Sequence, residues 1–101
     1  MTFTKVGSEA DFLYDRMVGL QESGEEILIA RAGGRFYALS NLCTHNGCRL
    51  SGGRIRDGKI RCPCHGSLFD PATGKVLRGP AEGPLRVYQI KVENGQIWVN
   101  R

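Results

Sequence analysis

The sequence predicts an all-β domain in which short antiparallel strands close as a barrel or a sandwich. Three observations support this fold class. Short runs of apolar and β-branched residues recur along the chain, glycine-containing turn signals separate them, and only residues 8–15 have the pattern of a helical turn. Ser8 is the expected cap of that turn, with Asp11 three residues later. A chain of 101 residues has room for one hydrophobic core, so we take residues 1–101 as a single domain.

Three pairs of strand-like runs predict three β-hairpins. Residues 26–31 pair with 35–39, residues 54–56 with 59–62, and residues 88–92 with 96–99. The turns between them contain Gly33-Gly34, Asp57-Gly58 and Asn94-Gly95. Such pairs adopt the positive φ angles that tight hairpin turns require. In residues 88–92 apolar and polar side chains alternate, which is the pattern of a strand with one buried face.

Composition and charge exclude several classes of protein. The formal net charge of +4 is modest for a small domain, and we expect no nucleic-acid partner. The longest strongly apolar runs, such as residues 27–30, are far shorter than the roughly 20 residues of a membrane-spanning helix. Residues 1–6 lack the basic and apolar segments of a secretory signal, so we expect a cytoplasmic protein. Without such a signal, the four cysteines favour a metal site over a disulfide scaffold.

The two histidines of the chain both lie close to cysteines. One residue separates Cys43 from His45, and two residues separate Cys62 from His65. Each tight segment therefore offers one thiol and one imidazole to a metal, and such spacing also lets backbone amides point toward the sulfur atoms. Because the chain has no other histidine, no imidazole is left for general acid–base chemistry.

Three interpretations of this site are open. Zinc-finger sites usually group cysteine with cysteine and histidine with histidine, whereas here each segment carries one of each. The mixed pairs suit a [2Fe–2S] cluster in which one iron takes two thiolates and the other takes two imidazoles. The third interpretation is two buried thiols and two surface imidazoles with no metal. The spacing favours the cluster, and a zinc-binding module without redox function is the weaker alternative.

At this point the sequence resembles a known family. The first loop, residues 43–48 (Cys-Thr-His-Asn-Gly-Cys), and the second loop, residues 62–67 (Cys-Pro-Cys-His-Gly-Ser), are similar to the two cluster-binding loops of Rieske iron–sulfur proteins. The likeness continues through residues 36–41, residues 69–74 and the C-terminal hairpin. It implies a Rieske-like antiparallel β-sandwich or barrel with a small cluster-binding subdomain, in which the two loops lie side by side at one tip.

The resemblance also implies the roles of individual residues in binding one [2Fe–2S] cluster. Cys43 and Cys62 would bind one iron. His45 and His65 would bind the other iron and face solvent. These four side chains are the expected ligands.

Three further features bear on the stability and potential of such a cluster. Cys48 and Cys64 are either two inert core residues or a disulfide between the loops, and the disulfide resembles that of quinol-oxidising Rieske proteins, which many oxygenase ferredoxins lack. Ser67 is either a solvated turn serine or, as in these relatives, the donor of a hydrogen bond to a bridging sulfide that stabilises the reduced cluster. Phe69 replaces a tyrosine donor common in high-potential members. We therefore expect an intermediate to high potential within the family range of about −150 to +300 mV. Residues 79–84 are either a plain surface turn or the counterpart of the proline-rich loop that covers the cluster in the same relatives, which they resemble.

Basic residues crowd the segment between the two loops. They are Arg49, Arg54, Arg56, Lys59 and Arg61, against Asp57 as the only acid. They form either a solvated strand face or a docking surface for an acidic redox partner.

These features lead us to expect a soluble one-electron carrier, not an enzyme, that exchanges electrons with a redox-protein donor and acceptor. The alternative is a ferredoxin component or small subunit of an oxygenase, nitrite reductase or oxidase system, and the pair Cys48 and Cys64 weighs against the first two. The electron-transfer subunit of a quinol-oxidising complex is less favoured, because such subunits normally have an N-terminal membrane anchor and the sequence offers no candidate for one.

Overall fold

The structure, a computed structural model, describes residues 2–100, so Met1 and Arg101 at the ends of the expected domain lie outside the described residues. Its strands are β1 (Phe3–Ser8), β2 (Arg16–Glu22), β3 (Glu25–Ala32), β4 (Arg35–Ser40), β5 (Arg54–Arg56), β6 (Lys59–Arg61), β7 (Leu68–Phe69), β8 (Val76–Arg78), β9 (Val87–Glu93) and β10 (Gln96–Asn100). The helical segments are two short 3₁₀ turns, η1 (Glu9–Asp11) and η2 (Leu50–Gly52). The all-β prediction is confirmed. Within residues 2–100, no helix has the length and apolar character that a membrane crossing requires.

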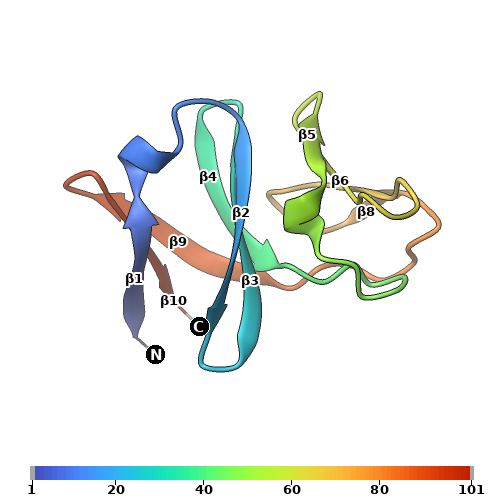
Figure 1. Ribbon diagram of the computed structural model, residues 1–101, viewed down its shortest axis with the longest axis horizontal. Helices are drawn as coiled ribbons and strands as arrows, with labels where there is room; N and C mark the ends of the chain where they lie inside the picture. The colour runs from blue at the N-terminus through green and yellow to red at the C-terminus, as the bar shows by residue number, and fades with distance from the viewer. Residues whose placement is uncertain (1, 101) are drawn as a thin grey trace.

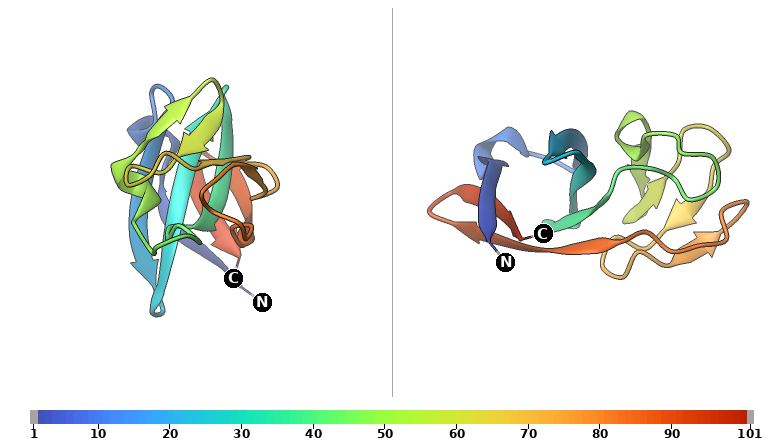
Figure 2. Two further views of the ribbon diagram at one scale, coloured as in Figure 1. Left: turned by 90° about the vertical axis from the view of Figure 1, so that its right-hand side faces the viewer. Right: turned by 90° about the horizontal axis from the view of Figure 1, so that it is seen from below.

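The strands form two sheets that lie side by side (Figures 1 and 2). One sheet has six strands in the order β1-β10-β9-β4-β3-β2, and the other has four in the order β5-β6-β7-β8. Along the chain, β5 to β8 come between β4 and β9, which are hydrogen-bonded neighbours in the six-stranded sheet. The chain therefore leaves the larger sheet after β4, builds the smaller sheet, and returns at the adjacent strand.

The three predicted hairpins are confirmed as β3–β4, β5–β6 and β9–β10. In two of the turns a non-glycine residue has positive φ, with Asp57 and Asn94 both at 51° and the following glycines both at 75°. This is the backbone geometry of a two-residue turn that matches the twist of the flanking strands.

The segment before the first hairpin differs from the prediction. Instead of a helical turn over residues 8–15, the structure has only the three-residue η1 between β1 and β2. Ser8 does cap it, because its hydroxyl accepts from the Ala10 N–H and its own N–H donates to the Asp11 carboxylate. Only Phe12 is buried in the rest of this segment, so a longer helix would have no apolar face to pack.

β3 separates two hydrophobic cores. Ile27 and Ile29 belong to the core of the six-stranded sheet, and Leu28 belongs to the core beneath the four-stranded sheet, as the alternation of side chains along a strand requires. The second core also contains Leu39, Leu50, Ile60 and Phe69, together with Cys43 and Cys62. The first residue of each loop is therefore anchored in apolar packing shared with the larger sheet.

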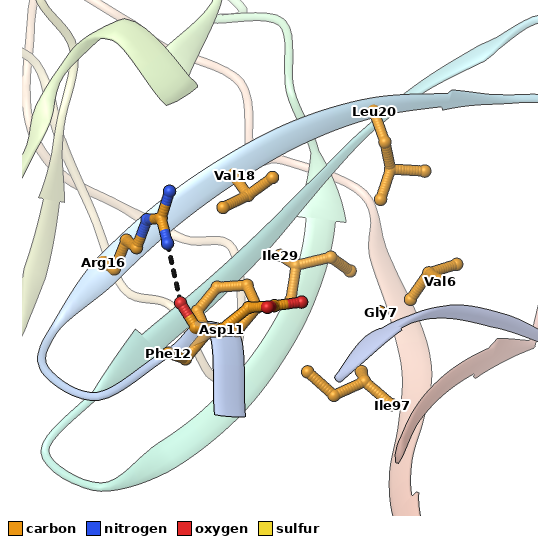
Figure 3. A pocket seen from close by; sticks show the side chains of 9 residues that line it. All are labelled: Val6, Gly7, Asp11, Phe12, Arg16, Val18, Leu20, Ile29 and Ile97. Carbon is orange, nitrogen blue, oxygen red and sulfur yellow. Dashed lines mark hydrogen bonds between the residues drawn. The ribbon is translucent and has the colours of Figure 1, made fainter. Parts of the chain in front are cut away.

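The six-stranded sheet is open along one seam. Its two edge strands, β1 and β2, face each other across an apolar cavity of about 230 Å³ (Figure 3). The cavity is lined by Val6, Val18, Leu20, Ile29 and Ile97, with Arg16 and Asp11 also at its wall. None of the four expected ligands lines it, so we assign it to the scaffold.

Candidate metal centre

The two loops have the same backbone geometry. In the first loop the Cys43 N–H donates to the Cys48 carbonyl, and the Gly47 N–H donates to the Cys43 carbonyl, both at 2.8 Å. The second loop repeats these bonds from its own first and fifth residues, at 2.9 and 3.2 Å. The fifth residue is glycine in each loop, with φ of 74° at Gly47 and 77° at Gly66, a region that residues with a Cβ rarely adopt.

The first residue of each loop supplies a buried free thiol. Cys43 is 3% exposed and Cys62 is 1% exposed, and neither takes part in a disulfide. Burial raises the pKa of the Cys43 thiol above its ordinary value, the backbone amide of His45 opposes this rise, and the neighbouring Cys62 thiol adds to it through a hydrogen bond. The two sulfur atoms are therefore close together and shielded from water.

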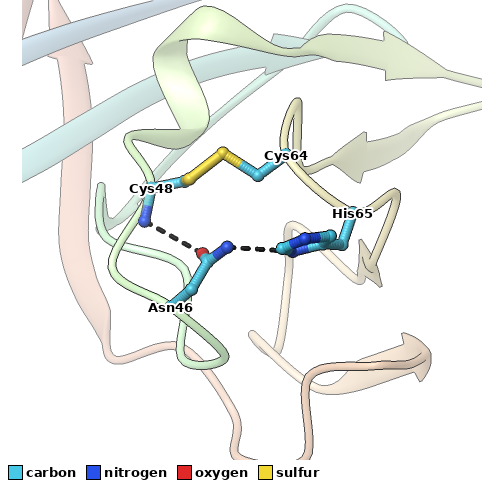
Figure 4. The surroundings of a disulfide bond; sticks show 4 residues. All are labelled: Asn46, Cys48, Cys64 and His65. Atoms are coloured by element: carbon cyan, nitrogen blue, oxygen red, sulfur yellow. Dashed lines mark hydrogen bonds between the residues drawn. A yellow bond between two sulfur atoms is a disulfide. The ribbon is translucent and has the colours of Figure 1, made fainter.

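Both expected histidine ligands are exposed to solvent. The ring centroids of His45 and His65 lie 5.2 Å apart, with their planes at 83°. Asn46 holds the second ring, since its side-chain amide donates a hydrogen bond to His65 Nδ1 at 2.9 Å (Figure 4). The Asn46 side-chain oxygen accepts from the Cys48 N–H at 3.2 Å, so this one side chain connects the two loops.

A disulfide between Cys48 and Cys64 also joins the loops, as the resemblance implies (Figure 4). The two residues are 16 apart in sequence, and their Cα atoms are 6.5 Å apart. Cys64 is exposed and Cys48 half-buried, whereas the two free thiols are buried. The four cysteines therefore divide into a solvent-facing cross-link and a buried pair of candidate ligands.

This donor set fits a two-metal cluster better than a single ion. In residues 2–100, no three side chains of histidine, cysteine, aspartate or glutamate converge on one point. The thiols and the imidazoles instead converge as two pairs, one buried and one exposed. A [2Fe–2S] cluster of this mixed type takes two thiolates at one iron and two imidazoles at the other.

Residues 79–84 are fastened to both loops. The Thr44 hydroxyl donates to the Gly83 carbonyl at 2.6 Å, and the Ala81 N–H donates to the Ser67 hydroxyl oxygen at 3.0 Å. Ser67 is fully buried. Within the described residues its hydroxyl acts as an acceptor only, so its proton remains for a donor role.

Sequence reasoning identified the candidate ligands but not the residues that hold the loops together. Thr44 and Asn46 make bonds between segments distant in sequence, which a six-residue motif does not reveal. Asn46 carries one usable signal, because asparagine often accepts from the N–H two residues later in turns. Arg49 was grouped with the basic residues between the loops, but the structure pairs it with Glu26 on β3 at 2.6 Å. The sheet register instead brings Arg78 into that group.

Comparison with known families agrees with the site. Residues 2–89 match the model of the Rieske [2Fe-2S] domain. The chain belongs to this family. The cofactor of this Rieske domain is therefore one [2Fe–2S] cluster, and its role is electron transfer rather than catalysis, as predicted. The zinc alternative loses its support.

Two groups of relatives resemble this Rieske domain. The naphthalene 1,2-dioxygenase system ferredoxin component of Pseudomonas putida is 34% identical over 91 residues, which cover 90% of this chain and 88% of that protein. The cytochrome b6-f complex iron–sulfur subunit of Chlorobaculum tepidum is 36% identical over 80 residues, which cover 79% of this chain and 43% of that protein. A solved chain from the complex of reduced oxygenase and oxidized ferredoxin in carbazole 1,9a-dioxygenase superposes with a TM-score of 0.91 at 31% identity, covering 96% of this chain and 100% of that one.

Proposed function

We propose that residues 1–101 form a single Rieske domain in which Cys43 and Cys62 bind one iron of the cluster and His45 and His65 bind the other. The pairing of the side chains carries this proposal, since two buried thiols are in contact and two exposed imidazoles lie 5.2 Å apart. When bound, such a cluster accepts and returns one electron at a time. The buried thiols would keep water from one side of the site, and the exposed imidazoles would present the other side to a partner protein.

The iron and acid-labile sulfide content of purified variants tests the ligand set. Cys43→Ser and Cys62→Ser should each lose most of the iron and sulfide, because thiolate is the stronger ligand for the cluster iron. The matched control is the double variant Cys48→Ser with Cys64→Ser, which removes two thiols from the same loops and should keep a full complement. Full iron content in either single variant would contradict the assignment.

We further propose that the protein is a ferredoxin component that carries electrons toward the oxygenase of an oxygenase system. The extended match to the Pseudomonas putida ferredoxin and the superposition on a ferredoxin in complex with its oxygenase support this role. On the sequence alone, the pair Cys48 and Cys64 weighs against this role, because many oxygenase ferredoxins lack such a disulfide. In the structure, however, the disulfide cross-links the loops and leaves both candidate thiol ligands free.

Stopped-flow reoxidation of the reduced protein tests this assignment. The oxygenase of a naphthalene dioxygenase system should reoxidise it faster than a c-type cytochrome of high potential does. Faster transfer to the cytochrome would favour a partner of the high-potential type instead.

The proposal also includes a basic surface for docking to the partner protein. Arg54 and Arg56 on β5 and Lys59 and Arg61 on β6 form no ion pair within residues 2–100, since the salt bridges there involve other residues. We assign this face to an acidic patch on the donor or the acceptor. Association should slow as ionic strength rises, because exposed charges are screened beyond a Debye length of about 10 Å at 0.1 M salt. An association rate that does not change with salt would contradict the assignment.

We also propose a cytoplasmic location, where the disulfide has to withstand reduction. To persist there, it needs a reduction potential below about −300 mV, which resists the glutathione pool. Rapid alkylation during lysis checks this, and we expect Cys48 and Cys64 to remain unmodified. Modified Cys48 and Cys64 would show that the bond is open in the cell.

A further inference from the structure

The four-stranded sheet carries a row of like charges across its strands. In the β5–β6 hairpin, Arg54 lies opposite Arg61 and Arg56 lies opposite Lys59. Residues directly opposite each other in an antiparallel pair share one face of the sheet, so all four side chains project from the same side. Like charges in such pairs destabilise the sheet. The hairpin therefore carries four cations against a single acid, Asp57 in its turn.

The register extends this basic face across the other two strands. Arg61 on β6 pairs with Leu68 on β7, and Leu68 pairs with Arg78 on β8. Arg78 is exposed and joins the same face at the opposite edge of the sheet. Three of the four strands thus contribute cations to one surface. The apolar Leu68 lies between Arg61 and Arg78 on it.

A pocket of about 240 Å³ opens on this face. It is lined by Arg56, Asp57, Lys59, Arg61, Gly66, Leu68 and Arg78. Four cations thus surround a space that contains a single carboxylate. None of these five charged side chains belongs to the salt bridges found within residues 2–100. The excess positive charge in the pocket is therefore not neutralised by the protein.

One wall of the pocket belongs to the second loop. A β-carbon placed on Gly66 would lie 3.3 Å from Arg61 Nη2, so the guanidinium packs directly against this glycine. Gly66 immediately follows His65, one of the candidate ligands. An anion bound to Arg61 would therefore place negative charge next to the cluster-binding loop.

We propose that this pocket binds a dianionic oxyanion of the phosphate class, and that its binding lowers the midpoint potential of the cluster. Guanidinium groups present several donors in a planar fork that matches the oxygens of phosphate. Four cations facing one acid favour a dianion over a single carboxylate. The binding step does not depend on the proposed electron carrier, whereas the effect on the potential rests on it.

Isothermal titration of the cluster-loaded, oxidised protein with inorganic phosphate tests the binding step. Ionic strength is held constant with sodium chloride, at a pH where phosphate is a dianion. We expect saturable binding at one site, with acetate much weaker. Arg61→Gln and Arg78→Gln should each weaken phosphate binding about tenfold, the order expected for losing one charge-assisted hydrogen bond.

The matched control is Arg35→Gln. Arg35 is an exposed arginine at the start of β4, in the β3–β4 hairpin of the other sheet, and it does not line the pocket. This variant loses the same charge and should bind phosphate as the parent protein does. Absence of saturable binding, equal binding of acetate, or equal weakening by the control would each overturn the proposed pocket.

Thermal unfolding of the same variants provides a readout that does not depend on the ligand. Because Arg61 lies opposite Arg54, Arg61→Gln should raise the unfolding temperature at low salt without phosphate, and phosphate should raise it in the parent protein by mass action. A lower unfolding temperature for this variant, with phosphate binding unchanged, would show that Arg61 has a structural role only.

The midpoint potential tests the coupling between the two sites. Phosphate at a concentration near the dissociation constant of the parent protein should lower it in the parent protein and in Arg35→Gln and much less in Arg61→Gln, and the reduced protein should bind phosphate more weakly by the corresponding factor. Bound phosphate without a potential change would overturn the coupling. If the protein binds phosphate but carries no cluster, the proposed function fails and the pocket stands. If it carries the cluster but binds no phosphate, only the pocket fails.

Discussion

The six-stranded sheet has strands of five to eight residues, whereas the strands of the four-stranded sheet are two or three residues long. The larger sheet gains its stability from long ladders of backbone hydrogen bonds and from a continuous apolar core. The smaller sheet is held by a disulfide, by hydrogen bonds that Asn46 and Thr44 donate and that Ser67 accepts, and by a shared core beneath it. Cross-links between the loops therefore take the place of the long strand pairings of the larger sheet.

Truncation of the core beneath the four-stranded sheet should cause the largest loss of unfolding free energy. Phe69 is fully buried in the core beneath the four-stranded sheet, and Ile97 is fully buried in the core of the six-stranded sheet. Phe69→Ala should cost about 3–5 kcal/mol of unfolding free energy, and Ile97→Ala about 2–5 kcal/mol. Urea denaturation measures both values. Only Phe69→Ala should also reduce the cluster content of the protein that remains folded. Equal cluster loss in both variants would show that the two cores act as one.

Removal of the disulfide between Cys48 and Cys64 should cause the next largest loss of unfolding free energy. The double variant Cys48→Ala with Cys64→Ala should lose about 3 kcal/mol, the value for closing a loop of this length in the unfolded chain. Amide hydrogen exchange should show faster opening of the two loops and of β5 to β8, with β3 and β4 little changed. Dithiothreitol should shift the parent protein toward the variant and leave the variant unchanged. Uniform loss of protection over both sheets would contradict a local role.

Ser67→Ala should have a smaller effect on stability and a distinct effect on potential. It leaves the buried Ala81 N–H without its acceptor, at a cost of about 1–3 kcal/mol. It also removes the proposed hydroxyl donor, so the midpoint potential should fall. Ser51→Ala is the control, since its hydroxyl bonds to Asn41 on the side of the larger sheet. An unchanged potential in Ser67→Ala would exclude the donor role, although the loss of stability would remain.

The ion pair between Arg49, the residue after the first loop, and Glu26 on β3 should have the smallest effect on the free energy of unfolding. Arg49 lowers the pKa of Glu26, so the pair stabilises the folded state above the ordinary glutamate pKa of about 4.3. This contribution is lost as the pH falls through the lowered folded-state pKa. Urea midpoints of the parent protein and Arg49→Gln should therefore differ slightly at neutral pH and converge in acid. Because Arg49 is largely exposed, a large difference at neutral pH would contradict this account.

The sequence predicts the two sheets unequally. Turn chemistry located three hairpins, because a pair such as Asn94-Gly95 fixes its conformation locally. β1 was missed because its pairing depends on a distant partner, β10. β2 pairs with the next strand, β3, through a two-residue turn in which Ser23 and Gly24 both have positive φ, and this turn is not among the predicted hairpins. The pattern of residues 8–15 looked helical because caps are local, but whether a helix continues depends on what its face packs against.

The candidate site also combines features that the sequence predicts with contacts that it does not. The cysteine and histidine spacing identified the cluster, and the resemblance implied the disulfide that the structure contains. The pairing of Arg49 with Glu26, the addition of Arg78 to the basic face and the bridging role of Asn46 all depend on which segments become neighbours. Such contacts between elements follow from the register of the sheets, which single residues do not determine.

The ligand set is the central claim, and the presence of only two histidines allows a direct test. Pulsed electron paramagnetic resonance of the reduced protein, labelled with ¹⁵N only at histidine, reports nitrogen bound to the paramagnetic cluster. We predict two strongly coupled ¹⁵N nuclei in the parent protein, one of which disappears in His45→Cys or His65→Cys. A spectrum with no strongly coupled ¹⁵N, or with only one in the parent protein, would contradict the account.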